Sequence, residues 1–412
     1  MFEFLNSDGR NTVVFASYNG LLDPLGSSQI LPYLERLHVE WPIWIMSFER
    51  PDRLGDHVAV SAMEQRLSAQ GIRWSRLRYH KWPSLAATTY DLLRGMAELR
   101  RIAMRTRIAL VHSRSYVTNT MVLNALPSTP FLFDIRGLQA DEYVDGGVWK
   151  RGELKWRLAK SSERRFFRRA DAAVVLTNNI REHVTACFRD EGRAPPLEVI
   201  PCCVDLERFT FADSDRKSTR ASLSIPEEAT VFVYSGSLGT WYLSDEMARF
   251  VRRYAEQTGE KVVLLWLVNN DQPQARRASA QVGLTDSQVR FVSAAPKDVP
   301  RYLAAADVGL ALIKQSFSKR SSSPTKYAEY LSMGMPVVIS RDVGDGAVIA
   351  ERDGGVALHE FDDVAFDAGV QRLTALREAP RSQFRKLAEA LFDVETVAVP
   401  AYRRLYRGLI RS

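Results

Sequence analysis

Residues 321–336 combine hydroxyl groups, a cation and a carboxylate at the start of an expected helix. Ser323 is a good N-cap, and Pro324 suits the first helical position. Gly334 would end the helix. The serine hydroxyls and the free N–H groups of the first turn together form an anion site. Lys326 serves the helix dipole poorly in that turn, so a bound anion such as a diphosphate explains its position better.

Glu329 follows Lys326 at the i+3 spacing that lets two side chains face the same ligand. A carboxylate there can accept two hydrogen bonds from a ribose diol, as an acidic residue does in dinucleotide-binding folds. The alternative is a solvated Lys–Glu pair on a well-capped helix, and the local residues leave both interpretations open. Tyr327, Tyr330 and Leu331 would face the core.

Two other loops place glycines between an expected strand and an expected helix, where a backbone can approach phosphate. One follows the strand at residues 13–17 and the other follows the strand at residues 231–235. A tight turn would also explain such glycines, and the spacing is not that of the dinucleotide fingerprint. The residues concerned are Gly20, Gly26 and Ser27 in the first loop and Gly236 and Ser237 in the second.

Charged side chains lie at the ends of two further expected strands. His112 and Arg114 end one of them, and Asp134 and Arg136 end the other. A lone histidine at a strand end is mostly a packed, hydrogen-bonded residue, so we assign His112 no base role. Arg114 suits a phosphate or carboxylate. Asp134 and Arg136 either form an internal ion pair or contact a ligand, because buried charges must be paired or used.

Short β-branched runs alternate with helical patterns, which is typical of a parallel sheet covered on both faces. The pattern stops over residues 202–228 and restarts at residue 231, so we expect two doubly wound units in tandem, with ligand at the carboxyl ends of their strands. The expected strands are 13–17, 43–48, 108–112, 131–134, 173–176, 198–200, 231–235, 261–268, 289–292, 308–313 and 336–339. The expected helices are 28–40, 58–69, 89–105, 118–126, 149–169, 178–187, 363–377 and 381–411.

The composition narrows the class of protein. A chain of 412 residues suits two domains, and 46% hydrophobic with 25% charged residues is ordinary for a soluble globular protein. The longest apolar run, residues 262–268, is far shorter than the roughly 20 residues that span a bilayer, and we see no signal peptide. The three cysteines, Cys187, Cys202 and Cys203, do not form a disulfide framework, and their spacing does not match a zinc site. This pattern favours the reducing cytoplasm as the compartment of the protein.

The segment around Glu329 resembles the signature of the retaining, GT-B fold glycosyltransferases of glycosyltransferase family 4. Glu329 matches the second Glu of that signature, and residues 334–338 match the GxPVV that follows. Ser321 stands where the first Glu is usual, and Pro324 with Lys326 matches a variant found in bacterial polysaccharide transferases. Residues 200–209 resemble the family's interdomain linker and residues 391–409 its last helix.

The resemblance implies an α/β protein of GT-B fold, in which two Rossmann-like doubly wound domains face one another across a cleft. An N-terminal acceptor-binding domain would span residues 1–203 and a C-terminal donor-binding domain residues 204–390. The C-terminal helix, residues 391–412, would cross back to the N-terminal domain.

The implied activity is metal-independent hexosyl transfer from a UDP or GDP type nucleotide sugar, with retention of configuration. The acceptor would be a glycan or lipid-linked oligosaccharide of a bacterial capsule, O-antigen or exopolysaccharide. Glu329 would hold the ribose and Lys326 the diphosphate, and Arg114 joins them as a catalytic residue. The donor-binding residues would be Gly20, Gly26, Ser27, Gly236, Ser237, Ser321, Ser322, Ser323, Thr325, Lys326 and Glu329. The acceptor-binding residues would be Arg114, Tyr116, Asp134 and Arg136, and no residue is assigned to a metal.

The net charge of +7 is concentrated in a basic stretch that begins at Trp149 and ends at Arg169. With its interleaved aromatic residues, this stretch could lie on an anionic membrane at the inner face of the cell membrane. A solvated basic helix is the alternative. No motif of a known nucleic-acid-binding module accompanies the charge, so we expect no nucleic-acid partner.

Two alternatives of the same fold stay open. A nucleotide-sugar epimerase would need cleft carboxylates, for which Asp134, Asp141 and Glu142 are the candidates. A donor-binding protein without activity is the other, because Ser321 and Ser237 replace the usual Glu and Arg. A phosphorylase would need a lysine for pyridoxal phosphate.

Overall fold

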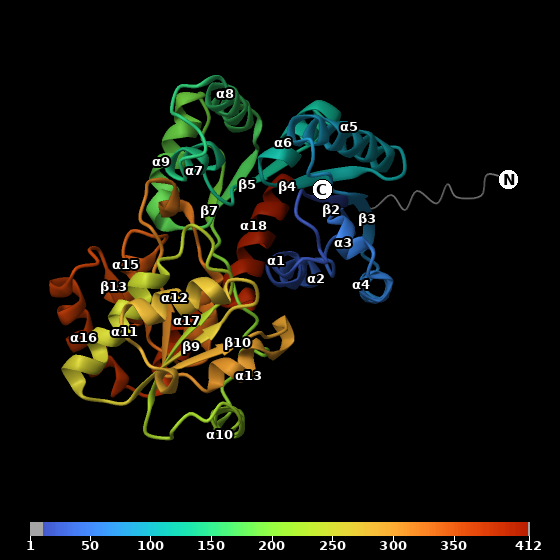
Figure 1. Cartoon of the computed structure of the whole chain (residues 1–412). Helices are drawn as coiled ribbons and strands as arrows, with labels where there is room; N and C mark the ends of the chain where they lie inside the picture. The colour runs from blue at the N-terminus through green and yellow to red at the C-terminus, as the bar shows by residue number, and fades with distance from the viewer. Residues whose placement is uncertain (1–10, 411–412) are drawn as a thin grey trace. The chain divides into compact units, whose positions relative to one another are not determined.

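The computed structural model describes residues 11–410 and divides the chain into two compact units. Unit 1 comprises the chain up to Ile200 together with the chain from Val394 onward, and unit 2 is Pro201–Asp393. Figure 1 traces both units from the N-terminus in blue to the C-terminus in red.

Unit 1 is built on a parallel sheet whose strand order, over the described residues, is β3-β2-β1-β4-β5-β6-β7. Every residue of β1, β2, β5 and β6 is buried, as expected for strands covered by helices on both faces. The register places Val13 beside Ile43 of one neighbour and Leu110 of the other. The strands are β1 (Thr12–Ser17), β2 (Ile43–Glu49), β3 (Arg73–Arg78), β4 (Ile108–Arg114), β5 (Phe131–Asp134), β6 (Ala172–Val175) and β7 (Leu197–Val199).

The helices of unit 1 mostly follow the expected pattern. The single helix expected at 28–40 is instead two short helices, α1 and α2, each with a proline in its first turn. The helices of unit 1 are α1 (Pro24–Gln29), α2 (Leu31–Leu37), α3 (Pro51–Leu54), α4 (His57–Ala69), α5 (Ser84–Ala103), α6 (Tyr116–Ala125), α7 (Gln139–Asp145), α8 (Leu154–Arg169), α9 (Asn178–Asp190), the π-helix η4 (Val394–Ala398) and α18 (Val399–Leu409).

The C-terminal helix α18 belongs to unit 1. It packs against α2, beside which it is drawn in red in Figure 1. Tyr402 of α18 stacks on Tyr33 of α2 with 4.6 Å between the ring centroids. This aromatic contact buries both rings and holds the end of the chain on the unit that contains its beginning.

Unit 2 repeats the architecture with a parallel sheet of strand order β10-β9-β8-β11-β12-β13 over the described residues. Large buried side chains, among them Trp266, Tyr234 and Tyr254, fill its core. The strands are β8 (Thr230–Ser235), β9 (Val262–Leu267), β10 (Val289–Val292), β11 (Val308–Ala311), β12 (Val337–Ser340) and β13 (Gly355–Leu358). The helices are α10 (Asp213–Ser222), α11 (Ser244–Thr258), α12 (Gln272–Gln281), α13 (Val299–Ala304), α14 (Thr325–Ser332), α15 (Gly346–Glu351), α16 (Asp363–Arg377) and α17 (Arg381–Phe392), with 3₁₀ helices η1 (Asp286–Gln288), η2 (Pro296–Asp298) and η3 (Ser318–Ser321).

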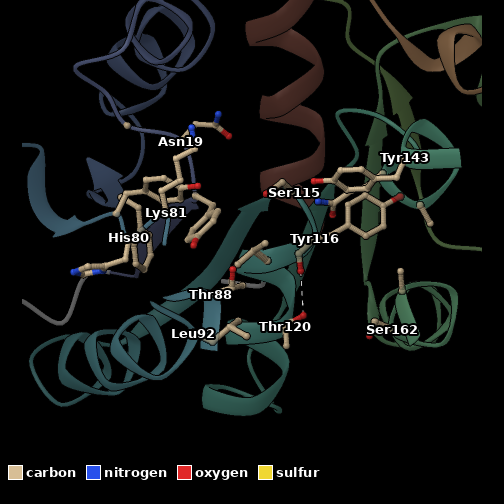
Figure 2. Close-up of a pocket in the computed structure, with 18 of the residues that line it drawn as sticks. Asn19, His80, Lys81, Thr88, Leu92, Ser115, Tyr116, Thr120, Tyr143 and Ser162 are labelled. Atoms are coloured by element: carbon tan, nitrogen blue, oxygen red, sulfur yellow. Dashed lines mark hydrogen bonds between the residues drawn. The ribbon is translucent and has the colours of Figure 1, made fainter. Parts of the chain in front are cut away.

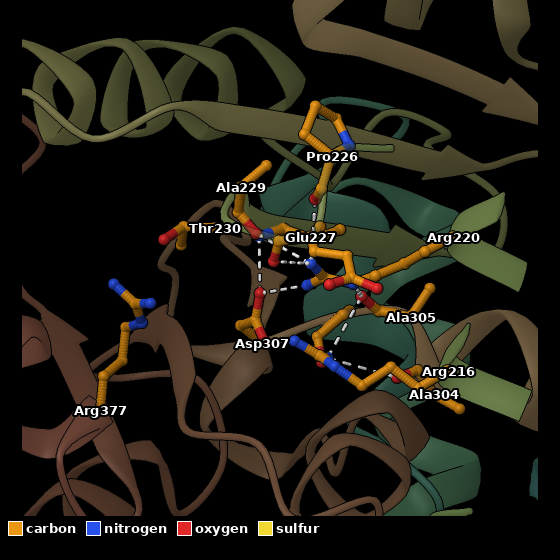
Figure 3. Close-up of polar contacts among 12 residues, drawn as sticks. Arg216, Arg220, Pro226, Glu227, Ala229, Thr230, Ala304, Ala305, Asp307 and Arg377 are labelled. Atoms are coloured by element: carbon orange, nitrogen blue, oxygen red, sulfur yellow. Dashed lines mark hydrogen bonds and ion pairs between the residues drawn. The ribbon is translucent and has the colours of Figure 1, made fainter. Parts of the chain in front are cut away.

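A polar cluster anchors α10 to the sheet of unit 2 (Figure 3). Arg216 and Arg220 of α10 donate to the two carboxylate oxygens of Asp307 at 2.6 and 2.7 Å. The backbone N–H of Val231 donates to the same carboxylate at 2.8 Å. Residues 202–228, where the strand–helix pattern of the sequence stops, therefore contain a helix, because its arginines pair with a carboxylate at the edge of the core.

None of the helices in the described part of the chain is both long and apolar enough to cross a bilayer.

Candidate functional site

The stretch before α14 differs from the sequence prediction in its capping. The helix begins at Thr325, and Pro324 rather than Ser323 occupies the N-cap. The Ser323 hydroxyl oxygen instead accepts a hydrogen bond from the backbone N–H of Cys202 at 3.0 Å. The Ser321 hydroxyl donates to the carbonyl of Ser318 at 2.5 Å, and Ser321 is buried. The prediction of a serine N-cap was wrong, because the extended backbone at Pro324 leaves Ser323 one residue before the N-cap.

Lys326 lies in the first turn of α14 with only 8% of its surface exposed. Its ammonium group donates a hydrogen bond to the Tyr242 hydroxyl at 3.0 Å. It also lies over the rings of Tyr242 and Tyr234, 4.3 and 5.2 Å from their centroids. Among the described residues no carboxylate approaches this ammonium within 4 Å. A buried ammonium held only by a phenol and two π-faces is suited to an anionic ligand.

Gly236 directly follows β8 and lies beside Lys326. Its φ is +113°, a conformation that side chains rarely adopt, and a β-carbon there would lie 3.0 Å from Lys326 Nζ. Ser237 follows and is exposed, while the next backbone N–H, of Leu238, donates to Asp271 at 2.8 Å. The absence of a side chain at Gly236 therefore allows the loop to lie close to the lysine, while phosphate binding by this loop stays a prediction.

Glu329 lies one turn further along α14 and is half-buried. Burial raises the pKa of its carboxyl group, and the positive charges of Lys326 and Arg208 oppose that shift. Over the described part of the chain no donor is hydrogen bonded to the Glu329 carboxylate. Tyr327, Tyr330 and Leu331 are buried, as predicted.

The tyrosines that surround Lys326 were not recognised from the sequence. Tyr242 stands seven residues after the end of β8, and its backbone forms a bridge with Ile313 after β11. Lys319 adds a second cation at this loop, with its ammonium 4.0 Å from the centroid of the Trp241 ring. The aromatic residues of the 236–242 loop were the available signal, since they follow a strand end directly.

The first glycine loop, in unit 1, is held by a buried carboxylate that the sequence analysis did not single out. Glu49 accepts hydrogen bonds from the backbone N–H groups of Leu21 at 2.7 Å and Leu22 at 3.1 Å. A β-carbon on Gly20 would lie 2.3 Å from a Glu49 oxygen, and one on Gly26 would lie 1.9 Å from the Gly20 carbonyl oxygen. Both glycines are thus needed for the packing of the loop.

Ser27 is placed differently from the prediction. It lies inside α1, not in a loop before a helix, and its hydroxyl donates to the Pro24 carbonyl at 3.0 Å. The helix starts at Pro24 because proline is preorganised for the first turn.

The charged residues at the ends of β4 and β5 form a buried network. Arg136 donates to the Asp134 carboxylate at 2.9 Å, which confirms the internal ion pair considered as one alternative. His112 Nε2 donates to the same carboxylate at 3.3 Å, and Tyr406 donates to His112 Nδ1 at 2.8 Å. Burial would raise the pKa of Asp134, but Arg136 and His112 together hold it below its ordinary value. Burial also lowers the pKa of His112, which is therefore neutral and packed, as expected.

Arg114 and Tyr116 flank the start of α6. Arg114 is buried and donates to the Gln29 carbonyl at 3.0 Å. Tyr116 donates to Glu163 at 3.0 Å and lines a cavity of about 710 Å³ that lies entirely within unit 1 (Figure 2). Of the four predicted acceptor residues, only Tyr116 lines this cavity; Arg114, Asp134 and Arg136 do not.

The basic stretch after Trp149 forms helix α8. Its buried face contains Phe166 and Phe167, whereas Leu154 and Leu158 are 71% and 60% exposed. Lys160 pairs with Asp141 at 2.6 Å and with Glu163 at 2.7 Å. The helix thus presents exposed leucines among basic residues on its outer surface.

Within residues 11–410, no three or more His, Cys, Asp or Glu side chains are grouped so that they could hold a metal ion.

Comparisons with known proteins agree with this geometry. Residues 43–208 match the model of Glycosyltransferase Family 4, and residues 229–375 match the model of Glycosyl transferases group 1. No curated protein matches the chain.

Solved structures resemble the chain over almost its whole length. A glycosyltransferase from Rickettsia africae has 12% identity and a TM-score of 0.68, with 98% of this chain and 99% of that chain covered. Sucrose-phosphate synthase from Thermosynechococcus elongatus has 16% identity and a TM-score of 0.70, with 97% and 100% covered. Anabaena HepE, solved with UDP and glucose, has 14% identity and a TM-score of 0.63, with 96% and 99% covered. Together with the two parallel sheets, these similarities show the GT-B fold that the sequence predicted.

Proposed function

The chain is a glycosyltransferase of the GT-B fold, and on that premise we propose that it transfers a hexose from a nucleoside-diphosphate sugar to a glycan or lipid-linked oligosaccharide. The transfer proceeds with retention of configuration and without a metal, in the synthesis of a bacterial surface polysaccharide. The observation that carries the proposal is the buried ammonium of Lys326, which lies beside Gly236 with no carboxylate partner in the described chain.

Unit 2 binds the donor in this proposal. Lys326 neutralises the diphosphate, and the backbone at Gly236 and Ser237 approaches the same phosphates because no side chain intervenes at Gly236. Both groups stabilise the negative charge that develops on the leaving nucleoside diphosphate. Glu329 accepts hydrogen bonds from the ribose diol, for which its carboxylate is available.

Solved structures that resemble this chain support UDP as the nucleotide of the donor. HepE was solved in complex with UDP-glucose as well as with UDP and glucose. A UDP-type donor is therefore the first choice for this chain. WaaG, a glycosyltransferase involved in lipopolysaccharide biosynthesis, has 14% identity and a TM-score of 0.67 and favours a surface-polysaccharide role.

Unit 1 supplies the acceptor side. The exposed leucines Leu154 and Leu158 of α8, among its basic residues, fit contact with an anionic membrane that carries a lipid-linked acceptor.

A thermal-shift titration with UDP, GDP and ADP tests the donor site. Ligand binding to the folded state raises the apparent stability by about 2.7 kcal/mol at 100 times Kd. We expect one diphosphate to shift the wild type and not Lys326→Met, which keeps the length of the side chain but removes the charge. Lys217→Ala, at an exposed lysine of α10, is the control and should respond like the wild type. An equal shift in Lys326→Met would contradict the assignment.

A further inference from the structure

A buried carboxylate in unit 1 has no part in the proposed donor site. Asp91, in the middle of α5, is completely buried. It accepts hydrogen bonds from the Tyr18 hydroxyl at 2.8 Å, from the backbone N–H of His80 at 3.0 Å and from His80 Nδ1 at 2.6 Å. One carboxylate thus fixes residues from two loops, one after β1 and one after β3.

The two residues fixed by Asp91 both line the 710 Å³ cavity, and His80 is labelled in Figure 2. The His80 side chain is 34% exposed. Because Nδ1 donates its hydrogen to Asp91, Nε2 of the neutral ring is a hydrogen-bond acceptor. In the described part of the chain Nε2 has no hydrogen-bond partner. This nitrogen is therefore available to a ligand in the cavity that His80 lines.

Aromatic side chains contribute much of the rest of the cavity wall, which also contains small polar residues and one carboxylate, that of Asp23. Tyr143 and Trp149 stack with 4.3 Å between their centroids and offer a flat apolar surface. Of the two permanent cations that line the cavity, Arg50 is already held by both carboxylate oxygens of Asp52, which leaves Lys81. An aromatic surface with few precisely placed polar groups suits a neutral sugar ring, which has apolar C–H faces and a rim of hydroxyls.

Backbone strain marks the same cavity. Ser115, also labelled in Figure 2, has a φ of +82° and a ψ of 173°, a region that is essentially limited to glycine. Strained residues gather at functional sites because the surrounding structure holds them there.

We propose that this cavity binds the terminal sugar of the acceptor as an uncharged ring, and that His80 Nε2 accepts a hydrogen bond from one of its hydroxyls. Asp91 is a positioning residue, since it acts through His80, and the stacked pair Tyr143–Trp149 contacts the ring face. The inference rests on the proposed glycosyl transfer and names the substrate class of its acceptor site.

The experiment uses the full chain and a panel of methyl glycosides of glucose, galactose, mannose and N-acetylglucosamine. Saturation-transfer NMR reports their binding, and UDP-sugar consumption reports transfer. Two variants separate positioning from contact. His80→Asn keeps an N–H near the position of Nδ1 for Asp91 but loses the atom at Nε2, whereas His80→Gln carries an amide close to the Nε2 position.

We expect at least one methyl glycoside to bind the wild type. His80→Asn should raise the acceptor KM about tenfold, as for a lost hydrogen bond, with little change in kcat, and His80→Gln should restore part of the affinity. His57→Asn, at an exposed histidine of α4, should behave like the wild type. In all three variants the UDP-induced thermal shift should be unchanged, because the nucleotide belongs to unit 2.

Two results would overturn the inference: an unchanged acceptor KM in His80→Asn, or binding of glucose 1-phosphate with no binding of any uncharged glycoside. Failure of the proposed function gives a different pattern, in which the wild type shows no nucleotide-induced shift at all while glycoside binding is still measurable by NMR.

Discussion

Lys326 Nζ and the position of a β-carbon on Gly236 are 3.0 Å apart, so the glycine and the lysine occupy one site. The two residues come from different segments, the loop directly after β8 and the first turn of α14, and 90 positions separate them in the chain. Their contact makes the space at residue 236 part of the proposed donor site and not only a requirement of the turn.

Gly236→Ala should weaken nucleotide binding. The added methyl group would displace the Lys326 ammonium, and we expect a loss of at least about tenfold in UDP affinity, or about 1.4 kcal/mol. Gly239→Ala is a matched control, because Gly239 has a φ of +54° in the same loop but open space at its β-carbon. Isothermal titration with UDP measures both variants. Equal affinities would show that only backbone strain matters at residue 236.

Tyr242→Phe should loosen the hold on Lys326 while keeping the aromatic ring. Loss of the 3.0 Å hydrogen bond from the ammonium should lower the free energy of unfolding by about 0.5–1.5 kcal/mol. Nucleotide affinity should fall by up to about tenfold, because the ammonium is less well positioned. Urea unfolding and UDP titration check the two effects. Tyr302→Phe, on α13, is the control, and an identical response there would contradict a specific role for Tyr242.

Much of the fold could be predicted because the buried strands are continuous β-branched runs. Strands β5 and β10 match their expected bounds. Two strands were not predicted, β3 and β13. Strand β3 has the sequence RWSRLR at the edge of its sheet, where only Ser75 and Leu77 are buried and charged residues alternate with them. The sequence of such an edge strand is rich in polar residues, because one of its faces is exposed to solvent.

The candidate site was only partly accessible from the sequence. Lys326 and Glu329 lie on one helix, so their i+3 spacing is visible directly. Asp91 and His80 meet only because α5 packs beside the loop after β3, and no local spacing reveals a contact of this kind. The N-cap error at Ser323 has a similar cause, since that hydroxyl is bonded to the distant backbone of Cys202.

Asp307→Asn should destabilise unit 2 strongly. The change removes the charge that offsets Arg216 and Arg220 and that also lies 3.5 Å from Arg381. Burial already lowers the pKa of Arg381 to about 10, with Asp307 opposing the shift. Breaking a buried pair costs about 3–5 kcal/mol, and the partial exposure of this cluster reduces the expected loss below that range, to about 2–3 kcal/mol. Urea unfolding measures it, and Glu378→Gln, an exposed position at the end of α16, controls for the lost charge. A loss equal to that of the control would show that the arginines are held by backbone carbonyls alone.

Arg136→Gln should make the stability of unit 1 depend on pH in a different way from the wild type. In the wild type the pKa of Asp134 is held below its ordinary value, so its contribution to stability is present above the unfolded-state pKa, about 3.9, and is lost as the pH falls through the folded-state value. Without Arg136, burial dominates and raises this pKa, so the charged carboxylate is unfavourable at pH 7 and protonation relieves it.

The expected result is a loss of about 2–4 kcal/mol at pH 7 that shrinks toward pH 4.5. Urea unfolding curves of both proteins at several pH values between 7 and 4.5 measure the difference. Arg105→Gln, at an exposed arginine after α5, should show no such narrowing. A difference that stays constant with pH would mean that the guanidinium of Arg136 acts through its hydrogen bond to Tyr402, at 3.0 Å, and not through the charge of Asp134.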